Sequence, residues 1–381
     1  MKVRQGLLRT GDTPEAVLQS LALTDAQLVL VFGDVSVLCE QARRGTIAAA
    51  FPSAAIAGCS TAGEISGDGV AEGSLTVTAL RFESDIGVRV AETDIAGMDD
   101  SHAAGERLGR ALSGEGLRAV VVFGPGIDVN GSALVEGLGS VVGSTLPVTG
   151  GLAGDGGAFK ETCTLGPGGC GPRKVVALGL TGGALRFAHG SFGGWDAFGP
   201  LRKVTRSAGN VLYELDGEPA LEVYKRYLGQ YAKDLPASGL LFPFEMVSAQ
   251  REPVGLIRTI LGVDEATGSV TLAGNIDPQG YLRLMHSSTD RLVGGAERAA
   301  QSARDMLSSA ENALVMLVSC VGRKLVMGQR VEEEVEAVQD VFDAAAAVTG
   351  FYSYGEISPL ARGAACHLHN QTMTVTVIGE A

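Results

Sequence analysis

The stretch Gly58-Cys-Ser-Thr-Ala-Gly-Glu-Ile-Ser66 has a counterpart near the other end of the chain, Gly350-Phe-Tyr-Ser-Tyr-Gly-Glu-Ile-Ser358. Both stretches begin with glycine and carry Gly-Glu-Ile-Ser five residues later. Local structure alone does not require the same four-residue motif twice. The match therefore predicts two equivalent loops and an internal repeat that organises the molecule.

The residues around these stretches predict three copies of one unit. Each copy begins with a continuous apolar run rich in β-branched residues, which is typical of a strand buried on both faces; the runs are residues 28–32, 119–123 and 313–318. A helical stretch, a short strand, a glycine-rich loop and a final strand follow each run, and the third helix is expected at about residues 332–346. The predicted fold class is α/β, with layered sheets built from repeated strand-helix-strand-loop-strand units.

The region between the second and third copies follows a different pattern. It predicts short strands, such as residues 210–215, and a helix over about residues 220–228, with turn residues between them. We place a domain boundary near Gly199-Pro200. This boundary divides the chain into two domains, residues 1–198 and residues 199–381.

Composition and charge argue against several classes of partner. The chain has 381 residues, of which 45% are hydrophobic and 19% are charged, so it can bury a large core. The formal net charge is −13 and no basic stripe is present, which argues against nucleic acid and an anionic membrane surface as partners. The sequence shows no secretory signal and no apolar run of membrane-spanning length, so we expect a cytoplasmic protein.

The six cysteines are spread along the chain, and none form a Cys-x-x-Cys pair. Cys163 and Cys170 flank a Gly/Pro-rich turn, which would place them side by side in a hairpin. Zinc ligands usually lie closer together in the sequence. We therefore expect free thiols in a reducing compartment rather than a zinc site.

An acidic residue follows each glycine-rich loop. These residues are Glu64, Asp155 and Glu356, five or six positions after the first glycine of the loop. Ligands of α/β proteins collect outside the carboxyl ends of strands, where glycine lets backbone amides approach them. A carboxylate there would either meet a ligand amine or accept hydrogen bonds from its own loop. The second loop lacks the Glu-Ile-Ser motif, which favours a structural role for that copy.

Other residues at the same edge complete the expected ligand site. Arg323 follows the third apolar run, where its guanidinium is placed to hold a carboxylate such as a propionate or an amino acid. A solvated salt bridge is the alternative for this arginine. The remaining residues expected to line the site are Cys59, Ser60, Thr61, Gly63, Tyr354 and Asn370.

Cys59 and Ser60 open a different alternative, a nucleophilic enzyme. A catalytic triad needs a histidine base that a third group holds in place. The loop does not match the Gly-x-Ser-x-Gly motif of hydrolases, and none of the five histidines has a familiar catalytic setting. We therefore expect that the protein is not an enzyme.

The histidines are candidate ligands for a haem iron. His286 ends an apolar strand pattern, and His367 and His369 point the same way if their segment is extended. Haem needs one axial histidine and an apolar pocket. The sequence has no Cys-x-x-Cys-His attachment motif, so a bound haem b would be non-covalent. We take His286 and His369 as the candidates for the iron ligand.

Together these motifs resemble the FIST family, named for F-box and intracellular signal transduction proteins. The resemblance covers almost the whole chain, with N-terminal FIST motifs at residues 58–65, 150–155 and 176–180, and C-terminal FIST motifs at residues 210–217, 319–323, 350–357 and 369–372. It implies a cytoplasmic module that binds small molecules such as amino acids and reports to signalling partners. The chain also resembles, in length and two-domain layout, a subset of stand-alone members that are nitric-oxide-sensing haemoproteins acting on a histidine kinase.

The residues and the resemblance predict a sensor whose ligand occupies a cleft lined by the glycine-rich loops, where the two domains face each other. In its most concrete form, it is a haem-based nitric oxide sensor that reports to a separate histidine kinase. The alternatives are a haem-free sensor of an amino acid or similar metabolite, and an enzyme that uses Cys59 or Ser60.

Overall fold

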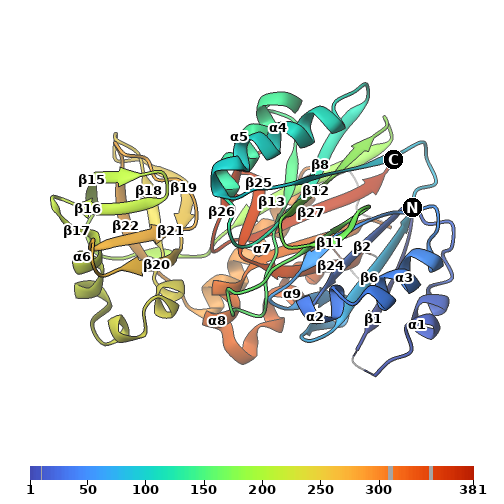
Figure 1. Ribbon diagram of the computed structural model, residues 1–381, viewed down its shortest axis with the longest axis horizontal. Coiled ribbons are helices and arrows are strands. Elements are labelled where there is room, and N and C mark those ends of the chain that lie inside the picture. Colours follow the sequence, from blue (N-terminus) through green and yellow to red (C-terminus); the bar gives the residue numbers. More distant parts are fainter. Residues whose placement is uncertain (10, 308–311, 343–345) are drawn as a thin grey trace.

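The computed structural model describes residues 1–9, 11–307, 312–342 and 346–381. The chain forms three sheets of six strands and a fourth sheet of nine strands. Figure 1 shows the fourth sheet at the left, beside a larger body that contains the other three. The structure is therefore α/β with layered sheets, as predicted. Within the described residues, no helix combines the length and the apolar character that crossing a membrane requires.

The three sheets of the body are built from three equivalent repeats, as the sequence predicts. Their strand orders are β1 (Lys2–Leu8), β6 (Leu75–Arg81), β2 (Leu28–Gly33), β3 (Ala55–Ser60); β7 (Gly87–Asp94), β12 (Lys174–Thr181), β8 (Leu117–Gly124), β9 (Val148–Leu152); and β13 (Leu185–Phe192), β27 (Met373–Glu380), β23 (Leu314–Cys320), β24 (Ala347–Ser353). In each sheet the last two of these strands are parallel and the others antiparallel.

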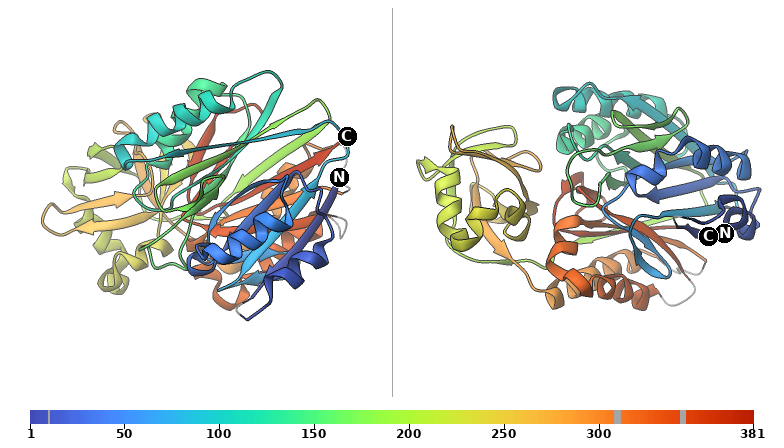
Figure 2. Two further views of the ribbon diagram at one scale, coloured as in Figure 1. Left: turned by 45° about the vertical axis from the view of Figure 1, so that its right-hand side comes forward. Right: turned by 60° about the horizontal axis from the view of Figure 1, so that its bottom comes forward.

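Helices cover the outside of the body. In the right-hand view of Figure 2, the helices of the second repeat lie above, those of the first at the right and those of the third below. These helices are α1 (Pro14–Leu21), α2 (Val35–Leu38) and α3 (Gln41–Ala50); α4 (Ser101–Leu112) and α5 (Gly131–Val142); and α7 (Thr289–Arg304), α8 (Val321–Met327) and α9 (Glu332–Phe342). Residues 343–345 of the helix expected at 332–346 lie outside the described residues.

Each repeat completes the sheet of another repeat with a short hairpin. The first repeat gives β4 (Glu64–Ser66) and β5 (Gly69–Ala71) to the third sheet, the second gives β10 (Thr164–Gly166) and β11 (Gly169–Gly171) to the first, and the third gives β25 (Gly355–Pro359) and β26 (Cys366–His369) to the second. The exchange is cyclic. It relates the repeats as a pseudo-threefold arrangement, in which no sheet is made by one repeat alone.

The first glycine of each loop is explained by a close approach between parallel strands. A Cβ atom at Gly58, Gly150 or Gly350 would lie 1.7, 2.0 or 1.9 Å from a carbonyl oxygen of the neighbouring strand. Gly150 and Gly350 also have positive φ angles of 133° and 152°, which disfavour side chains. The repeated glycine is therefore a packing requirement of the sheet.

The centre of the body is filled by aromatic side chains. Phe32, Phe123 and Phe351 are fully buried, with ring centroids 4.8 to 6.1 Å apart. The third repeat carries its ring on β24 rather than β23, since Phe351 pairs with Val318 where Phe32 pairs with Cys59. Such edge and tilted contacts add roughly 0.5–1.5 kcal/mol per pair beyond the buried area. The pseudo-threefold centre is thus hydrophobic core.

The fourth sheet interrupts the third repeat between β13 and α7. Its strand order is β19 (Pro253–Arg258), β18 (Phe244–Val247), β22 (Tyr281–His286), β15 (Arg202–Ala208), β16 (Val211–Leu215), β21 (Ser269–Leu272), β20 (Ile260–Asp264), with β14 (Asp196–Ala197) on β22 and β17 (Glu218–Pro219) on β16. With α6 (Ala220–Leu228), it encloses a separate apolar core. We call residues 196–286 the inserted sheet.

The sheets divide the chain differently from the expected domains. Residues 1–192 and 289–380 share the three-repeat body, whereas the inserted sheet stands beside it (Figure 1). The expected ranges 1–198 and 199–381 separate β13 from β27, although these two strands are paired along eight residues. The two-domain division at residue 198 remains a prediction that does not follow the strand pairing.

Candidate functional site

The two repeated glutamates have matching environments. Thr61 Oγ1 donates to Glu64 Oε1 at 2.5 Å, and the backbone N and Oγ of Ser74 donate to Oε2 at 3.1 and 2.6 Å. Glu356 accepts in the same way from Ser353 Oγ at 2.7 Å and from the N and Oγ1 of Thr372 at 3.1 and 3.0 Å. Both carboxyl groups are buried. Each glutamate therefore ties the base of its hairpin to the start of the final strand of its repeat. This is the second of the two expected roles, in which the carboxylate accepts hydrogen bonds from its own loop rather than meeting a ligand.

The third acidic residue does not occupy the equivalent position. Strand pairing places Thr164 where the other repeats have their glutamates, since Leu165 pairs with Gly58 as Ile357 pairs with Gly150. Asp155 lies earlier, in a longer loop.

Asp155 organises its own loop together with a residue of the third repeat. It accepts hydrogen bonds from the amides of residues 159, 160 and 161 at 2.8, 2.7 and 2.9 Å and from the hydroxyl of Tyr354. The Tyr354 ring stacks on Phe159 with a centroid distance of 4.1 Å. Burial by itself would raise the pKa of Asp155, but these hydrogen bonds outweigh it and hold the pKa below its usual value.

Cys59 and Ser60 are not presented as nucleophiles. Both are fully buried, and burial raises the pKa of the Cys59 thiol well above its usual value. Ser60 Oγ donates to the carbonyl of Gly154 at 2.7 Å and accepts from the amide of Cys163 at 2.9 Å. Gly63, with a φ of 138°, packs against Tyr352 and Lys324. This loop is part of the interior.

Arg323 is buried rather than solvated. Its guanidinium pairs with Glu334 at 2.7 Å, and neither side chain is exposed. It also donates to the carbonyl of Gly193, on the connection from β13 to the inserted sheet, and to the carbonyl of Leu292, in the first turn of α7 after the connection from β22. Arg323 therefore binds where each connection meets the body, and these donors are occupied within the chain.

The candidate histidines lie in different settings. His286 is exposed at the end of β22, with its ring centroid 5.4 Å from that of Phe198 in an edge-on contact. His369, on β26, is buried, and its Nε2 lies 2.8 Å from the carbonyl of Ser358. Burial lowers the pKa of His369 to about 4, so its ring is neutral at pH 7. The structure does not bring His286 and His369 into one site.

Five of the eleven buried side-chain polar atoms that have no partner in the described residues lie where the inserted sheet meets the body. The end of β26 and the turn after it contribute three of them, and the others come from α5 and the β19–β20 junction. In the described part of the chain, these unpartnered atoms are Ser132 Oγ, Thr259 Oγ1, His369 Nδ1, Asn370 Oδ1 and Gln371 Oε1. An unsatisfied buried polar group costs about 1–3 kcal/mol, so such a cluster indicates missing partners.

Arg258 crosses this junction from the inserted sheet. It is 3% exposed, and its Nη1 donates to the carbonyl of Leu368 in the body at 3.1 Å. A Cβ atom on Gly274 would contact both Arg258 and Ser132 Oγ, at 2.9 and 3.1 Å, so the arginine and α5 meet there. We call Arg258, His369, Asn370 and Gln371, with the unpartnered hydroxyls of Ser132 and Thr259, the junction site.

Comparison with known families agrees with the motifs. The family model of the FIST N domain matches residues 27–218, and that of the FIST C domain matches residues 220–359. The chain belongs to the FIST family. FIST domains are sensory domains, associated with small-ligand sensing in signal transduction. The matched FIST N range runs into the inserted sheet, and the FIST C range begins at α6.

Individual relatives of this FIST protein are distant. An uncharacterized protein of Methanocaldococcus jannaschii is 26% identical over 211 residues, which cover 52% of this chain. The match spans only 40% of that relative's length. A crystal structure of a cyanuric acid hydrolase from A. caulinodans aligns over 99% of this chain and 98% of its own, with 10% identity and a TM-score of 0.37.

Arg258 is the charged residue of the junction site that sequence reasoning missed, and Gln371, Ser132 and Thr259 were missed with it. It has no carboxylate within 4.0 Å among the residues that the structure describes, and burial lowers its pKa to about 10. A buried cation normally pairs with an anion. The only sequence signal is an arginine at the end of the apolar strand pattern Leu256-Ile257-Arg258, which does not reveal its burial.

Proposed function

We propose that this FIST protein senses a small zwitterionic ligand of the amino-acid type, bound at the junction site. The observation that carries the proposal is Arg258, a buried guanidinium without a carboxylate partner among the described residues. A ligand carboxylate would supply the missing anion, in the charge-assisted geometry that arginine favours. The geometry thus favours the metabolite-sensing alternative.

The unpartnered acceptors suit the other end of such a ligand. Asn370 Oδ1 and Gln371 Oε1 are buried acceptors. The carbonyl of Ser358 can only accept, so His369 donates from Nε2 and keeps a lone pair on Nδ1. An ammonium group offers three donors and no acceptor, which complements these three atoms.

The position of the junction site suggests how binding becomes a signal. Arg258 comes from the inserted sheet, whereas His369, Asn370 and Gln371 come from the body. A ligand that contacts both parts would favour one arrangement of them over others. A separate signalling partner, with a histidine kinase as the expected class, would respond to that arrangement.

The two candidate histidines do not fit a haem. Haem needs a broad apolar slot beside its axial ligand. His369 is 1% exposed and lies beside Arg258 and the carbonyl of Ser358. His286 is exposed and packs on Phe198. Haem-based nitric oxide sensing therefore gains no support from these surroundings, and a visible spectrum of the purified protein tests it directly.

The ligand proposal is tested by a thermal-shift screen of amino acids, followed by calorimetry on each compound that raises the melting temperature. We expect Arg258→Gln and Asn370→Ala to lose binding, because they remove the anion partner and one acceptor. Thr376→Val is the matched control, since Thr376 Oγ1 is another buried unpartnered atom but lies on β27.

Three results would count against the proposal. The first is a screen in which no compound stabilises the wild-type protein. The second is a ligand that binds Arg258→Gln as tightly as the wild type. The third is a stoichiometric Soret band that shifts with nitric oxide, which would support the haem-based alternative instead.

A further inference from the structure

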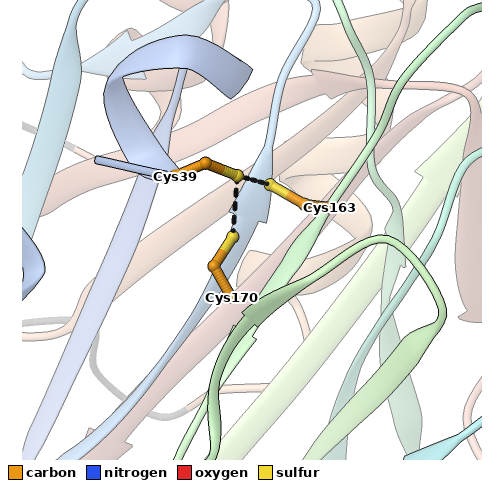
Figure 3. A group of neighbouring side chains, drawn as sticks. All are labelled: Cys39, Cys163 and Cys170. Carbon is orange, nitrogen blue, oxygen red and sulfur yellow. Dashed lines mark hydrogen bonds between the residues drawn. The ribbon is translucent and has the colours of Figure 1, made fainter. Parts of the chain in front are cut away.

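Three cysteines that are far apart in the sequence converge on one point. Cys39 Sγ lies 2.9 Å from Cys163 Sγ and 3.1 Å from Cys170 Sγ, and all three sulfur atoms lie within 4.8 Å of one another (Figure 3). Cys39 is separated from Cys163 by 124 positions. Cys163 and Cys170 lie close together, as the turn between them predicts, and the exchanged hairpin places Cys39 of the first repeat beside them.

The geometry points to a binding site for a thiophilic metal ion at Cys39, Cys163 and Cys170, with Zn²⁺ as the expected ion. Zinc binds thiolates at about 2.3 Å in tetrahedral geometry, which places the ligand sulfurs roughly 3.8 Å apart. Three sulfurs within 4.8 Å of one another can reach that spacing by small side-chain rotations. Soft sulfur ligands exclude Mg²⁺ and Ca²⁺, which require oxygen.

The site is open on one side. Cys163 is buried, whereas Cys39 and Cys170 are partly exposed, so an ion can enter from solvent. No fourth Cys, His, Asp or Glu joins the group among the described residues. The fourth position of a tetrahedral ion would therefore be taken by water or by a small exogenous ligand.

A metal ion at this site would also anchor the hairpin of the second repeat, which the first and third repeats anchor with a glutamate. Glu64 and Glu356 anchor their hairpins through three hydrogen bonds each, but the equivalent Thr164 makes a single side-chain bond, to the carbonyl of Lys174 at 2.6 Å. Cys163 and Cys170 belong to this less-anchored hairpin, and Cys39 follows α2 of the first repeat. A bound ion would therefore fasten the second repeat's hairpin to the first repeat.

The test uses the full chain, reduced and stripped of metal with a chelator, and titrated with Co²⁺ as a spectroscopic probe. We expect one cobalt per chain, a thiolate-to-cobalt charge-transfer band, and loss of that band when Zn²⁺ displaces the cobalt. Cys170→Ser should abolish the band. Cys366→Ser is the control, because Cys366 lies outside the group and contacts the carbonyl of Val148.

A second measurement needs no variant. Zn²⁺ should slow alkylation of Cys39 and Cys170 in the wild-type protein, as mapped by mass spectrometry, and leave Cys366 unchanged. The proposal would be overturned by fully reduced protein that gives no cobalt–thiolate band, or by a native disulfide between two of the three cysteines. Equal loss of the band in Cys170→Ser and Cys366→Ser would also overturn it.

Discussion

Glu356 shows how burial can outweigh hydrogen bonding at a single residue. Its carboxyl group accepts three hydrogen bonds, which favour the charged form, yet it is fully enclosed. Burial has the larger effect and raises the pKa of Glu356 to about 8. The residue that repeats Glu64 in the sequence is thus a neutral acid in the folded protein at pH 7.

This protonation makes stability depend on pH with a definite sign. An acid whose pKa is higher in the folded state binds more protons when folded, so stability falls as pH rises from about 4.5 to about 8. Glu356→Gln mimics the neutral acid at every pH. We expect the variant to match the wild type near pH 5 and to exceed it by roughly 3–5 kcal/mol above pH 8, measured by urea unfolding. Glu115→Gln, at an exposed position, is the control and should show no such difference.

At the scale of single residues, the sequence predicted some members of the junction site and missed others. His369 was predicted as a haem-iron ligand and Asn370 as a residue lining the ligand site, and each carries a buried atom without a partner in the described residues. Arg258 was missed because its burial depends partly on contact with a distant segment, since it donates to the carbonyl of Leu368, 110 positions away. The cysteine group was missed for the same reason, since its members meet only after a hairpin is exchanged between repeats.

At the scale of elements, the repeat was predictable but the exchange was not. The apolar runs form buried strands β2, β8 and β23, and the glycines mark their contact with β3, β9 and β24. Each of these signals is local. The exchanged hairpins have strands of only three to five residues, and nothing in so short a segment specifies which sheet it joins.

If the close approach of parallel strands is what requires the repeated glycine, alanine should have opposite effects on stability at Gly350 and at Gly139. Gly350→Ala should destabilise the protein by at least about 2–3 kcal/mol, because its Cβ would lie 1.9 Å from the carbonyl oxygen of Leu317 and its φ is positive. Gly139→Ala, within α5 with no atom within 4 Å of the new Cβ, should instead stabilise by about 0.5–1 kcal/mol. Denaturation midpoints measure both, and equal effects would refute the explanation.

At the scale of the whole molecule, the inserted sheet is joined to the body by two connections that one buried ion pair holds. Arg323 binds Glu334 and the carbonyls of Gly193 and Leu292. The indole of Trp195 donates to the carbonyl of Gln371 at 2.8 Å, beside the junction site. The contacts that set the position of the inserted sheet are therefore adjacent to the proposed ligand.

Removal of this ion pair should loosen the connections without unfolding the body. Arg323→Met alone leaves Glu334 buried and unpaired, which costs about 3–5 kcal/mol. We expect the double variant Arg323→Met/Glu334→Gln to recover most of that stability but to show faster amide hydrogen exchange at residues 193–198 and 286–292. Unchanged exchange in both segments of the double variant would show that Arg323 does not hold the connections.

The cyclic exchange of hairpins has a consequence for how the chain is made. During synthesis the first sheet waits for β10 and β11, the second for β25 and β26, and the third for its own strands near the C-terminus. The first sheet can be completed once residue 171 has left the ribosome, whereas the second sheet needs the chain through residue 369 and the third needs β27, which ends at Glu380. A chain that ends after the second repeat would leave the second sheet with an open edge and the β4–β5 hairpin without a sheet to join. Because each repeat depends on a hairpin from another repeat, an incomplete chain leaves strand edges unpaired, and these edges can pair with other chains.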